Sequence, residues 1–68
     1  MVRGKVKWFN SQKGWGFLSP ENGDSDVFVH YSRIDMEGYR NLKDNDEVLF
    51  EIEEGEKGPI AINVRKVT

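Results

Sequence analysis

The sequence predicts an all-β domain whose five short strands close into a small barrel. Three observations support this fold class. No stretch of the 68 residues repeats apolar positions every 3.6 residues or so, as an amphipathic helix would. Five stretches instead alternate apolar and polar residues, and clusters of Gly, Asn, Asp and Pro separate them. An open sheet of this size would expose two edges and bury little, so closure is expected.

The first three strands follow from this alternation. They are expected at residues 2–10, 15–19 and 26–31. The sequence Ser-Gln-Lys-Gly at 11–14 joins the first two, and the next connection contains Asn-Gly, a strong signal for a hairpin. The N-terminal half therefore predicts three consecutive strands joined by short turns.

Two further strands are expected at residues 47–53 and 60–67, joined by a turn rich in Gly and Glu. The connection from 32 to 45 is longer, with one short helical turn expected at 32–35. Connections of this length are uncommon in compact domains, so it is a candidate functional loop.

One hydrophobic core is expected, since 68 residues leave room for a single small domain. Without disulfides its stability should be a few kcal/mol. The expected core residues are Val6, Leu18, Val27, Val29, Ile34, Val48, Phe50, Ile52, Ile62 and Val64.

The net charge of −2 is unevenly distributed. Residues 1–20 carry four basic residues and no acid, giving +4, whereas residues 21–68 carry six bases and all twelve acids, giving −6. Such asymmetry indicates one face that meets an anion and another that keeps the protein soluble, although small proteins can show it by chance.

Several classes of protein are excluded. The chain has no cysteine and only one histidine, so neither a disulfide framework nor a structural zinc site is expected, and no cofactor is expected. No apolar run approaches about 18 residues, so no membrane span is expected. Basic residues interrupt the apolar positions at the N-terminus, which is unlike a secretory signal. The expected compartment is the cytoplasm.

The aromatic residues exceed what the core needs. Of eight, only Phe50 takes a clear inward position. Trp15 and Phe17 share the outward face of the second strand, and Phe28 and His30 that of the third. Exposed rings beside lysines suit single-stranded nucleic acid, because bases stack on the rings and lysines meet phosphates.

Two rings have ambiguous positions. Phe9 could equally well fill the core. Strict alternation from Val6 points Trp8 inward, and only a bulge in the first strand would turn it outward.

Two motifs carry a resemblance to a known family. Residues 13–18, KGWGFL, look like the first ribonucleoprotein motif, and residues 27–31, VFVHY, look like the second. RNA-recognition-motif domains share these motifs but need more length and two helices. Together with GKVKWFN at 4–10, EGY at 37–39 and GP at 58–59, the motifs make the whole chain resemble bacterial cold-shock proteins.

This resemblance implies a single cold-shock domain over residues 1–68, with a five-stranded antiparallel oligonucleotide-binding barrel. It implies binding of single-stranded RNA and DNA, preferably pyrimidine-rich, and an RNA-chaperone role in the cold-shock response and in gene regulation. It turns Trp8 outward. In a barrel of this type the first strand, which holds Arg3 and Lys5, pairs with the acidic strand at 47–53, and opposite charges across the two strands attract. The implied contacts are Lys7, Trp8, Phe9, Lys13, Trp15, Phe17, Phe28, His30, Tyr31 and Tyr39, with Asp26 at a base edge and Lys57 and Pro59 at one end. We expect a monomer.

The chain departs from the family's usual residues at several positions. Trp15, Tyr31 and Tyr39 replace other aromatic residues, so stacking should survive. Ile60 stands where a glutamine is usual and removes a hydrogen-bonding group. Lys57 often corresponds to arginine, so a bidentate or stacking contact there would weaken.

Two other functions are alternatives. A protein-interaction barrel would bury the rings against a partner, but interface cores are depleted of lysine. An enzyme would have to use His30, and no nucleophile, base and orienting group are evident together. The chain also lacks a phosphate-binding glycine loop, so ATP-driven unwinding is not expected.

Overall fold

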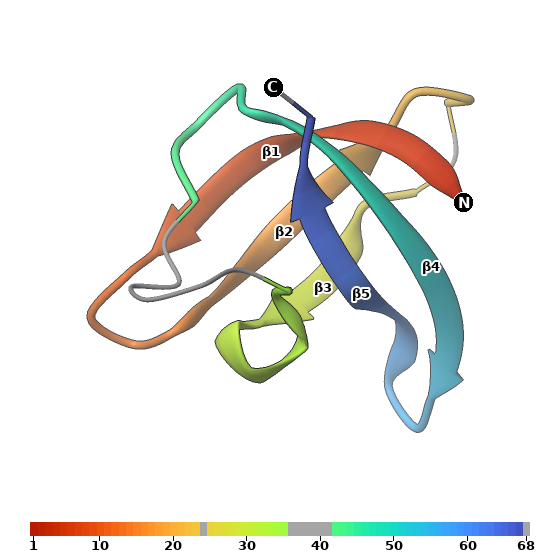
Figure 1. The fold of residues 1–68 in the computed structure, drawn as a ribbon. Helices are drawn as coiled ribbons and strands as arrows, with labels where there is room; N and C mark the ends of the chain where they lie inside the picture. The colour runs from red at the N-terminus through yellow and green to blue at the C-terminus, as the bar shows by residue number, and fades with distance from the viewer. Residues whose placement is uncertain (24, 36–41, 68) are drawn as a thin grey trace.

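Five strands form one closed barrel in the order β1-β2-β3-β5-β4 in the computed structural model (Figure 1). The structure describes residues 1–23, 25–35 and 42–67. The elements are β1 (Val2–Asn10), β2 (Trp15–Pro20), β3 (Val27–His30), the 3-10 turn η1 (Tyr31–Arg33), β4 (Glu47–Gly55) and β5 (Gly58–Lys66). The all-β prediction is confirmed. Every strand overlaps its predicted range, and the helical turn begins one residue earlier than expected.

Neighbouring strands run antiparallel around the barrel except at one junction. β1 pairs antiparallel with β2 and β4, β2 with β3, and β4 with β5. β3 and β5 are parallel, with Phe28 opposite Ile60. An odd number of strands cannot alternate in direction all the way around a closed ring, so at least one parallel junction is geometrically required.

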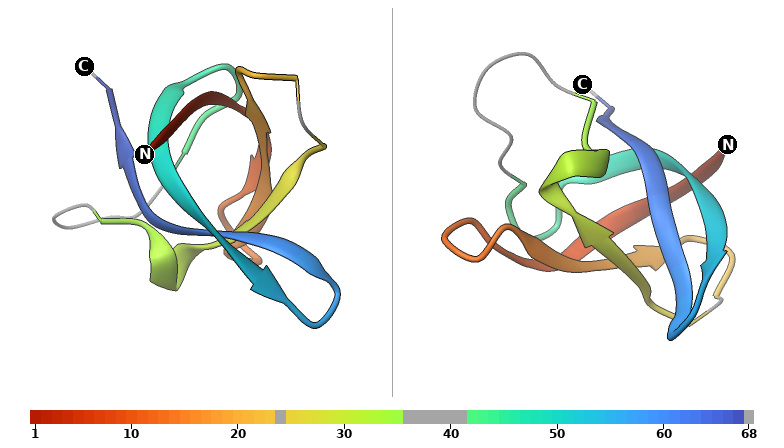
Figure 2. Two further views of the ribbon diagram at one scale, coloured as in Figure 1. Left: turned by 90° about the vertical axis from the view of Figure 1, so that its right-hand side faces the viewer. Right: turned by 90° about the horizontal axis from the view of Figure 1, so that it is seen from below.

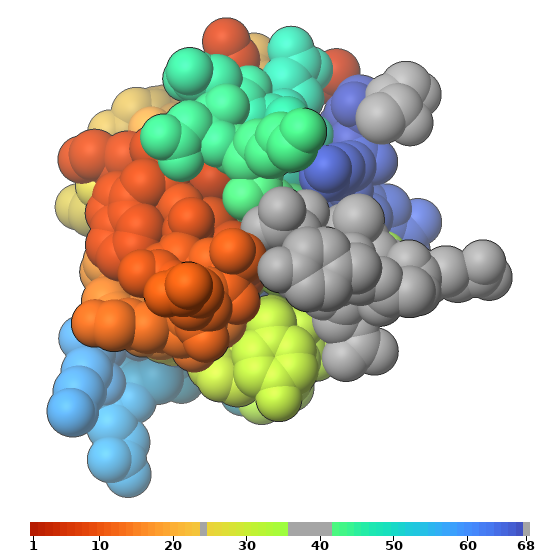
Figure 3. Space-filling model, turned by 90° about the vertical axis from the view of Figure 1, so that its left-hand side faces the viewer, coloured from red at the N-terminus to blue at the C-terminus, as the bar shows by residue number. Residues whose placement is uncertain are grey.

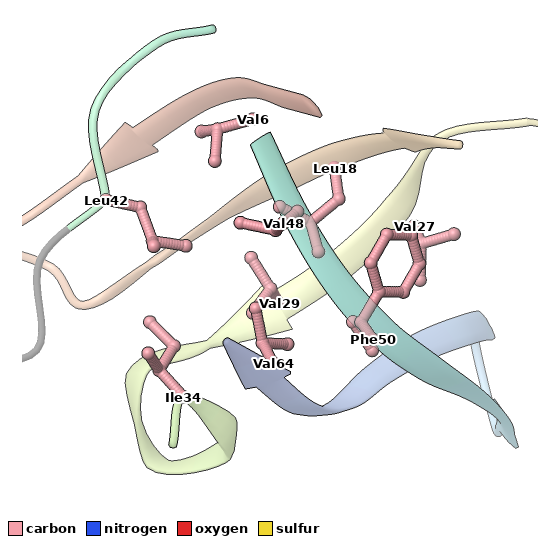
Figure 4. Packing of buried hydrophobic residues seen from close by; sticks show 10 residues of the cluster. Val6, Leu18, Val27, Val29, Ile34, Leu42, Val48, Phe50 and Val64 are labelled. Carbon is pink, nitrogen blue, oxygen red and sulfur yellow. The ribbon is translucent and has the colours of Figure 1, made fainter. Parts of the chain in front are cut away.

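The core fills the barrel interior much as the sequence predicts (Figure 4). Its members within the described residues are Val6, Leu18, Val27, Val29, Ile34, Leu42, Val48, Phe50, Ala61 and Val64. Two predicted core residues are wrong, because Ile52 is 37% exposed and Ile62 is only half-buried. Leu42 and Ala61 take part instead.

A bulge in β5 explains the exchange of Ile62 for Ala61. Leu49 pairs with Arg65 and Glu51 pairs with Ile62, so β5 uses one residue more than β4 over this interval. Asn63 absorbs the extra residue with a φ of 52°. Alternation is therefore broken, and Ala61 points inward where strict alternation would place Ile62.

Ile52 lies opposite Ala61 in the ladder, yet it remains exposed. The hairpin formed by the ends of β4 and β5 projects beyond the barrel wall, as the end-on view in Figure 2 shows. Ile52 therefore occupies an inward-facing position in the alternation of β4 and is still not buried.

The predicted pairing of the basic first strand with the acidic fourth is confirmed. Lys5 lies opposite Glu47 in the ladder, and the Arg3 guanidinium donates to the Glu47 carboxylate at 3.0 Å. Arg3 Nε also lies 3.9 Å from Glu21. Among the described residues, no helix is long and apolar enough to cross a bilayer.

Candidate nucleic-acid interface

Four aromatic rings from three neighbouring strands lie together on one outer surface of the barrel. We call Trp8, Trp15, Phe17 and Phe28 the aromatic face. The centroids of Trp8 and Trp15 are 5.2 Å apart, and Phe17 lies 5.9 Å from both Trp8 and Phe28. Their edge-on and tilted contacts are the geometries that aromatic pairs favour. The rings therefore support one another and keep part of their surface toward solvent.

The strand registers explain why these rings meet. Trp8 is the Cα partner of Phe17, which is the partner of Phe28, which is in turn the partner of Ile60. One continuous row of apolar side chains thus crosses β1, β2, β3 and β5. Paired residues point to the same side of a sheet, so the row forms one stacking surface.

Trp8 reaches this surface because β1 contains a bulge. Val6 pairs with Leu18 and Trp8 with Phe17, so Lys7 is an extra residue in β1. Alternation from the inward-facing Val6 would point Trp8 inward, but the inserted residue turns it outward. Trp8 is accordingly 37% exposed. The outward position that the resemblance implied is the one observed.

Gly16 lets β1 and β2 approach closely beneath the rings. A Cβ at this position would clash with the backbone of both Trp8 and Phe9. Glycine at this position therefore allows the close approach of the two backbones. Phe9 itself is half-buried and packs against the core, so its ring is not part of the aromatic face.

Charged residues border the aromatic face. The Lys7 ammonium donates to the Asp26 carboxylate at 2.8 Å, so two predicted contact residues form an ion pair. Lys13 is exposed in the loop after β1. The Asn10 side-chain oxygen fixes this loop by accepting from the backbone N–H groups of Gln12 and Lys13 at 3.0 and 2.9 Å.

His30 and Tyr31 extend the surface from the end of β3 into η1. Their ring centroids are 4.6 Å apart, and Tyr31 is 46% exposed. His30 is the Cα partner of Trp15, so it continues from the aromatic face. Its Nδ1 lies 2.9 Å from the Ser32 hydroxyl oxygen, which fixes the ring orientation.

At the opposite end, a hollow of about 580 Å³ lies between the aromatic face and the β4–β5 hairpin. Phe17, Phe28 and Ile60 supply its apolar wall, and residues 55–58, including the predicted Lys57, supply the hairpin side. Pro59 pairs with Glu54 close to the turn of the hairpin. The hollow can hold a flat apolar group beside a cation.

Ile60 was not among the predicted contact residues, although it ends the apolar row. Its place in the row depends on the parallel pairing of β3 with β5, for which the sequence carries no local signal. Tyr39 lies outside the described residues.

The sequence matches a known domain family over nearly all of its length. The 'Cold-shock' DNA-binding domain matches residues 2–67. A "Cold shock-like protein" of Thermotoga maritima is 56% identical over 66 residues, which cover 97% of this chain and 98% of that protein. A "Probable cold shock protein A" of Mycolicibacterium smegmatis is 51% identical over 67 residues, which cover 98% of this chain and 100% of that protein.

A solved structure gives an independent comparison of the fold. "Drosophila Unr CSD456" superposes with a TM-score of 0.81 over 98% of this chain, at 24% sequence identity. This chain spans about a quarter of that structure's length, 26%. From the family match and the curated relatives together, the chain belongs to the cold-shock DNA-binding domain family, whose members bind nucleic acids and are not enzymes.

Proposed function

We propose that this chain is a single cold-shock domain that binds single-stranded RNA and DNA by stacking bases on the aromatic face. The observation that carries the proposal is the apolar row that crosses four strands from Trp8 to Ile60. Bases in a duplex have both faces covered by their neighbours, whereas bases in a single strand can be splayed onto such a surface. Lys7 and Lys13 are positioned to meet the backbone phosphates.

Further contacts are proposed at both ends of the row. His30 and Tyr31, with Tyr39, continue the stacking surface, and Phe9 supports it from below. Asp26 accepts a hydrogen bond from a base edge. Lys57 and Pro59 belong to the hairpin end, where the hollow holds the last base.

The preference for pyrimidine-rich strands follows from the free-energy cost of unstacking the bases of the free strand. Pyrimidines stack weakly on one another, so a pyrimidine-rich strand gives up less when its bases move onto protein rings. The acidic remainder of the chain disfavours duplexes, where backbone charge dominates affinity. Binding therefore depends on exposed bases more than on charge.

An RNA-chaperone activity follows from the same selectivity. A protein that binds the unpaired state and not the paired one shifts the equilibrium toward unpaired RNA by mass action, without a nucleotide cofactor. We place this activity in the cytoplasm, in the cold-shock response and in gene regulation, with the protein acting as a monomer.

The proposal is tested by titrating tryptophan fluorescence with a short oligothymidine strand in low salt. Trp8 and Trp15 both lie in the aromatic face, so stacked bases should quench their emission. Phe17→Ala and Phe28→Ala should each weaken binding by roughly 5- to 150-fold, equivalent to about 1–3 kcal/mol per stacked base.

Ile52→Ala is the control, because Ile52 is exposed apolar surface outside the aromatic face. It should bind like the parent protein, and a duplex of the same length should bind far more weakly. Absence of quenching by the single strand, or equal losses in Ile52→Ala and Phe17→Ala, would contradict the proposal.

A further inference from the structure

The ring of Tyr31 lies directly against the backbone of Gly14. A Cβ added to Gly14 would lie 2.6 Å from Cδ1 of Tyr31 and 3.3 Å from Cε1. Real Cβ atoms do not approach other heavy atoms to 2.6 Å. The ring therefore occupies the space that a side chain at residue 14 would need, and Gly14 provides the surface on which one face of the ring lies.

The backbone that carries this surface is held in place by hydrogen bonds on both sides. Gly14 N–H donates to the carbonyl of Asn10 at 2.7 Å, and Tyr31 N–H donates to the carbonyl of Gly14 at 2.8 Å. Gly14 adopts a φ of +80°, which glycine takes without strain. The β1–β2 loop and the start of η1 are thus joined at one residue, and Figure 3 shows their atoms adjoining, in orange and yellow-green.

The position of the Tyr31 ring matters because it is otherwise a surface side chain. It is 46% exposed, more than Trp8 at 37%, and it lies in a three-residue turn, not in the sheet. Its centroid is 4.6 Å from His30, so seating on Gly14 keeps the two rings adjacent. An unseated ring would have to lose its rotamer freedom when a base binds.

We propose that Gly14 is a positioning residue for nucleic-acid binding, which holds the ring of Tyr31 beside His30 before a strand arrives. The inference deepens the proposed function and rests on it. The glycine contributes through the absence of a side chain, in addition to its permitted φ. The stacking surface is thereby preorganised beyond the end of β3.

The chain supplies a matched control for the backbone strain. Gly23 has a φ of +87°, close to that of Gly14, and a Cβ added to it would meet nothing within 4 Å. Gly14→Ala and Gly23→Ala therefore impose a similar strain, and only Gly14→Ala displaces the Tyr31 ring. Any difference in binding between the two variants therefore reports the displacement of the Tyr31 ring.

Binding of the same short oligothymidine is measured for both variants, well below their unfolding temperatures. Gly14→Ala should weaken binding about three- to tenfold, the cost of ordering one freed side chain, whereas Gly23→Ala should bind like the parent. In a Tyr31→Ala background, adding Gly14→Ala should cause no further loss. Equal binding by the two glycine variants, or a loss that persists without Tyr31, would overturn the inference.

A spectroscopic measurement tests the seating without the ligand. The Gly14 Hα resonances should be displaced by the ring current of Tyr31 and return toward ordinary glycine values in Tyr31→Leu. Unchanged resonances would show that the ring is not seated there, even if Gly14→Ala failed to fold. Failure of the parent protein to bind any strand would instead refute the proposed function and leave this seating result standing.

Discussion

The ammonium of Lys7 lies 2.8 Å from Oδ2 of Asp26, so a cation proposed for phosphate binding is neutralised before any strand arrives. Lys7 is the extra residue in the β1 bulge, and Asp26 immediately precedes β3. The two side chains are 59% and 35% exposed, so solvent and salt can compete for the pair. A phosphate must displace Asp26 to gain Lys7.

Asp26→Asn should therefore release Lys7 toward the nucleic acid, while the asparagine oxygen can still accept a hydrogen bond from a base edge. We expect tighter binding at low salt and a steeper salt dependence, by up to about 0.7 in the slope of log K against log salt, as for one more neutralised phosphate on a single strand. Fluorescence titrations at several salt concentrations measure both quantities.

Asp35→Asn is the matched control, because Asp35 also pairs with a cation, Arg65, at 3.4 Å and lies outside the aromatic face. It makes the same change in net charge and should leave the slope unchanged. Identical slopes for Asp26→Asn and the parent would show that Lys7 does not gain a phosphate.

Arg3→Glu should destabilise the barrel by about 1 kcal/mol in low salt, because it replaces an attraction to Glu47 and Glu21 with repulsion. For a domain of this size that corresponds to a fall of about 4–8 °C in Tm. Added salt should narrow the difference, since the groups are exposed. Arg3→Gln removes the attraction without adding repulsion, so its Tm should lie between those of the parent and Arg3→Glu. An unchanged Tm in low salt would contradict this account.

Asp46 should make the stability of the barrel depend on acid pH. The backbone N–H of Lys43 donates to its Oδ2 at 3.0 Å, and Lys66 lies 3.2 Å away, so these groups hold the pKa of Asp46 below its ordinary value against an opposing effect of burial. A carboxyl whose pKa is lowered by folding stabilises the native state fully above its unfolded-state pKa. That contribution is lost as the pH falls through the lower, folded-state pKa.

Asp46→Asn should accordingly lower the free energy of unfolding by about 1 kcal/mol at pH 7. The difference from the parent should shrink once the pH falls below about 4. Urea unfolding across pH 2–7 measures it, with the exposed neighbour Asp44→Asn as a control that stays close to the parent. A difference that is constant over this pH range would mean that the carboxylate charge plays no part.

Ile60→Ala should weaken binding of the oligothymidine about threefold, because it removes apolar surface beside Phe28 in the hollow. Ile52→Ala makes the same substitution in the partner strand of the hairpin, at a site outside the hollow. It should leave affinity unchanged. Equal affinities for the two variants would place the end of the bound strand elsewhere.

Local periodicity was sufficient to predict the five strands and most of the core, because inward and outward positions alternate wherever a strand is regular. It failed where one inserted residue changes the parity. The bulge at Lys7 turns Trp8 outward, and the bulge at Asn63 exchanges Ile62 for Ala61. A bulge leaves no trace in composition, so only the resemblance placed Trp8 correctly.

Positions outside the strands were harder still. Leu42 is buried from within the long connection, where no period applies. The contact between Phe28 and Ile60 joins strands far apart in sequence, and the seating of Tyr31 on Gly14 needs the loop and η1 in three dimensions. Residue types predicted the chemistry of the surface; only the topology showed which of its parts adjoin.

The parallel junction between β3 and β5 is paired over a shorter length than the β1–β2 junction of the barrel. Phe28 and Ile60 are its single registered pair, whereas β1 and β2 share a long ladder. A nucleic-acid strand bound along the apolar row would cross this junction and contact residues on both of its sides. The bound nucleic acid would thus link β3 to β5 where the ladder has a single registered pair, and amide exchange at this junction should slow first when it binds.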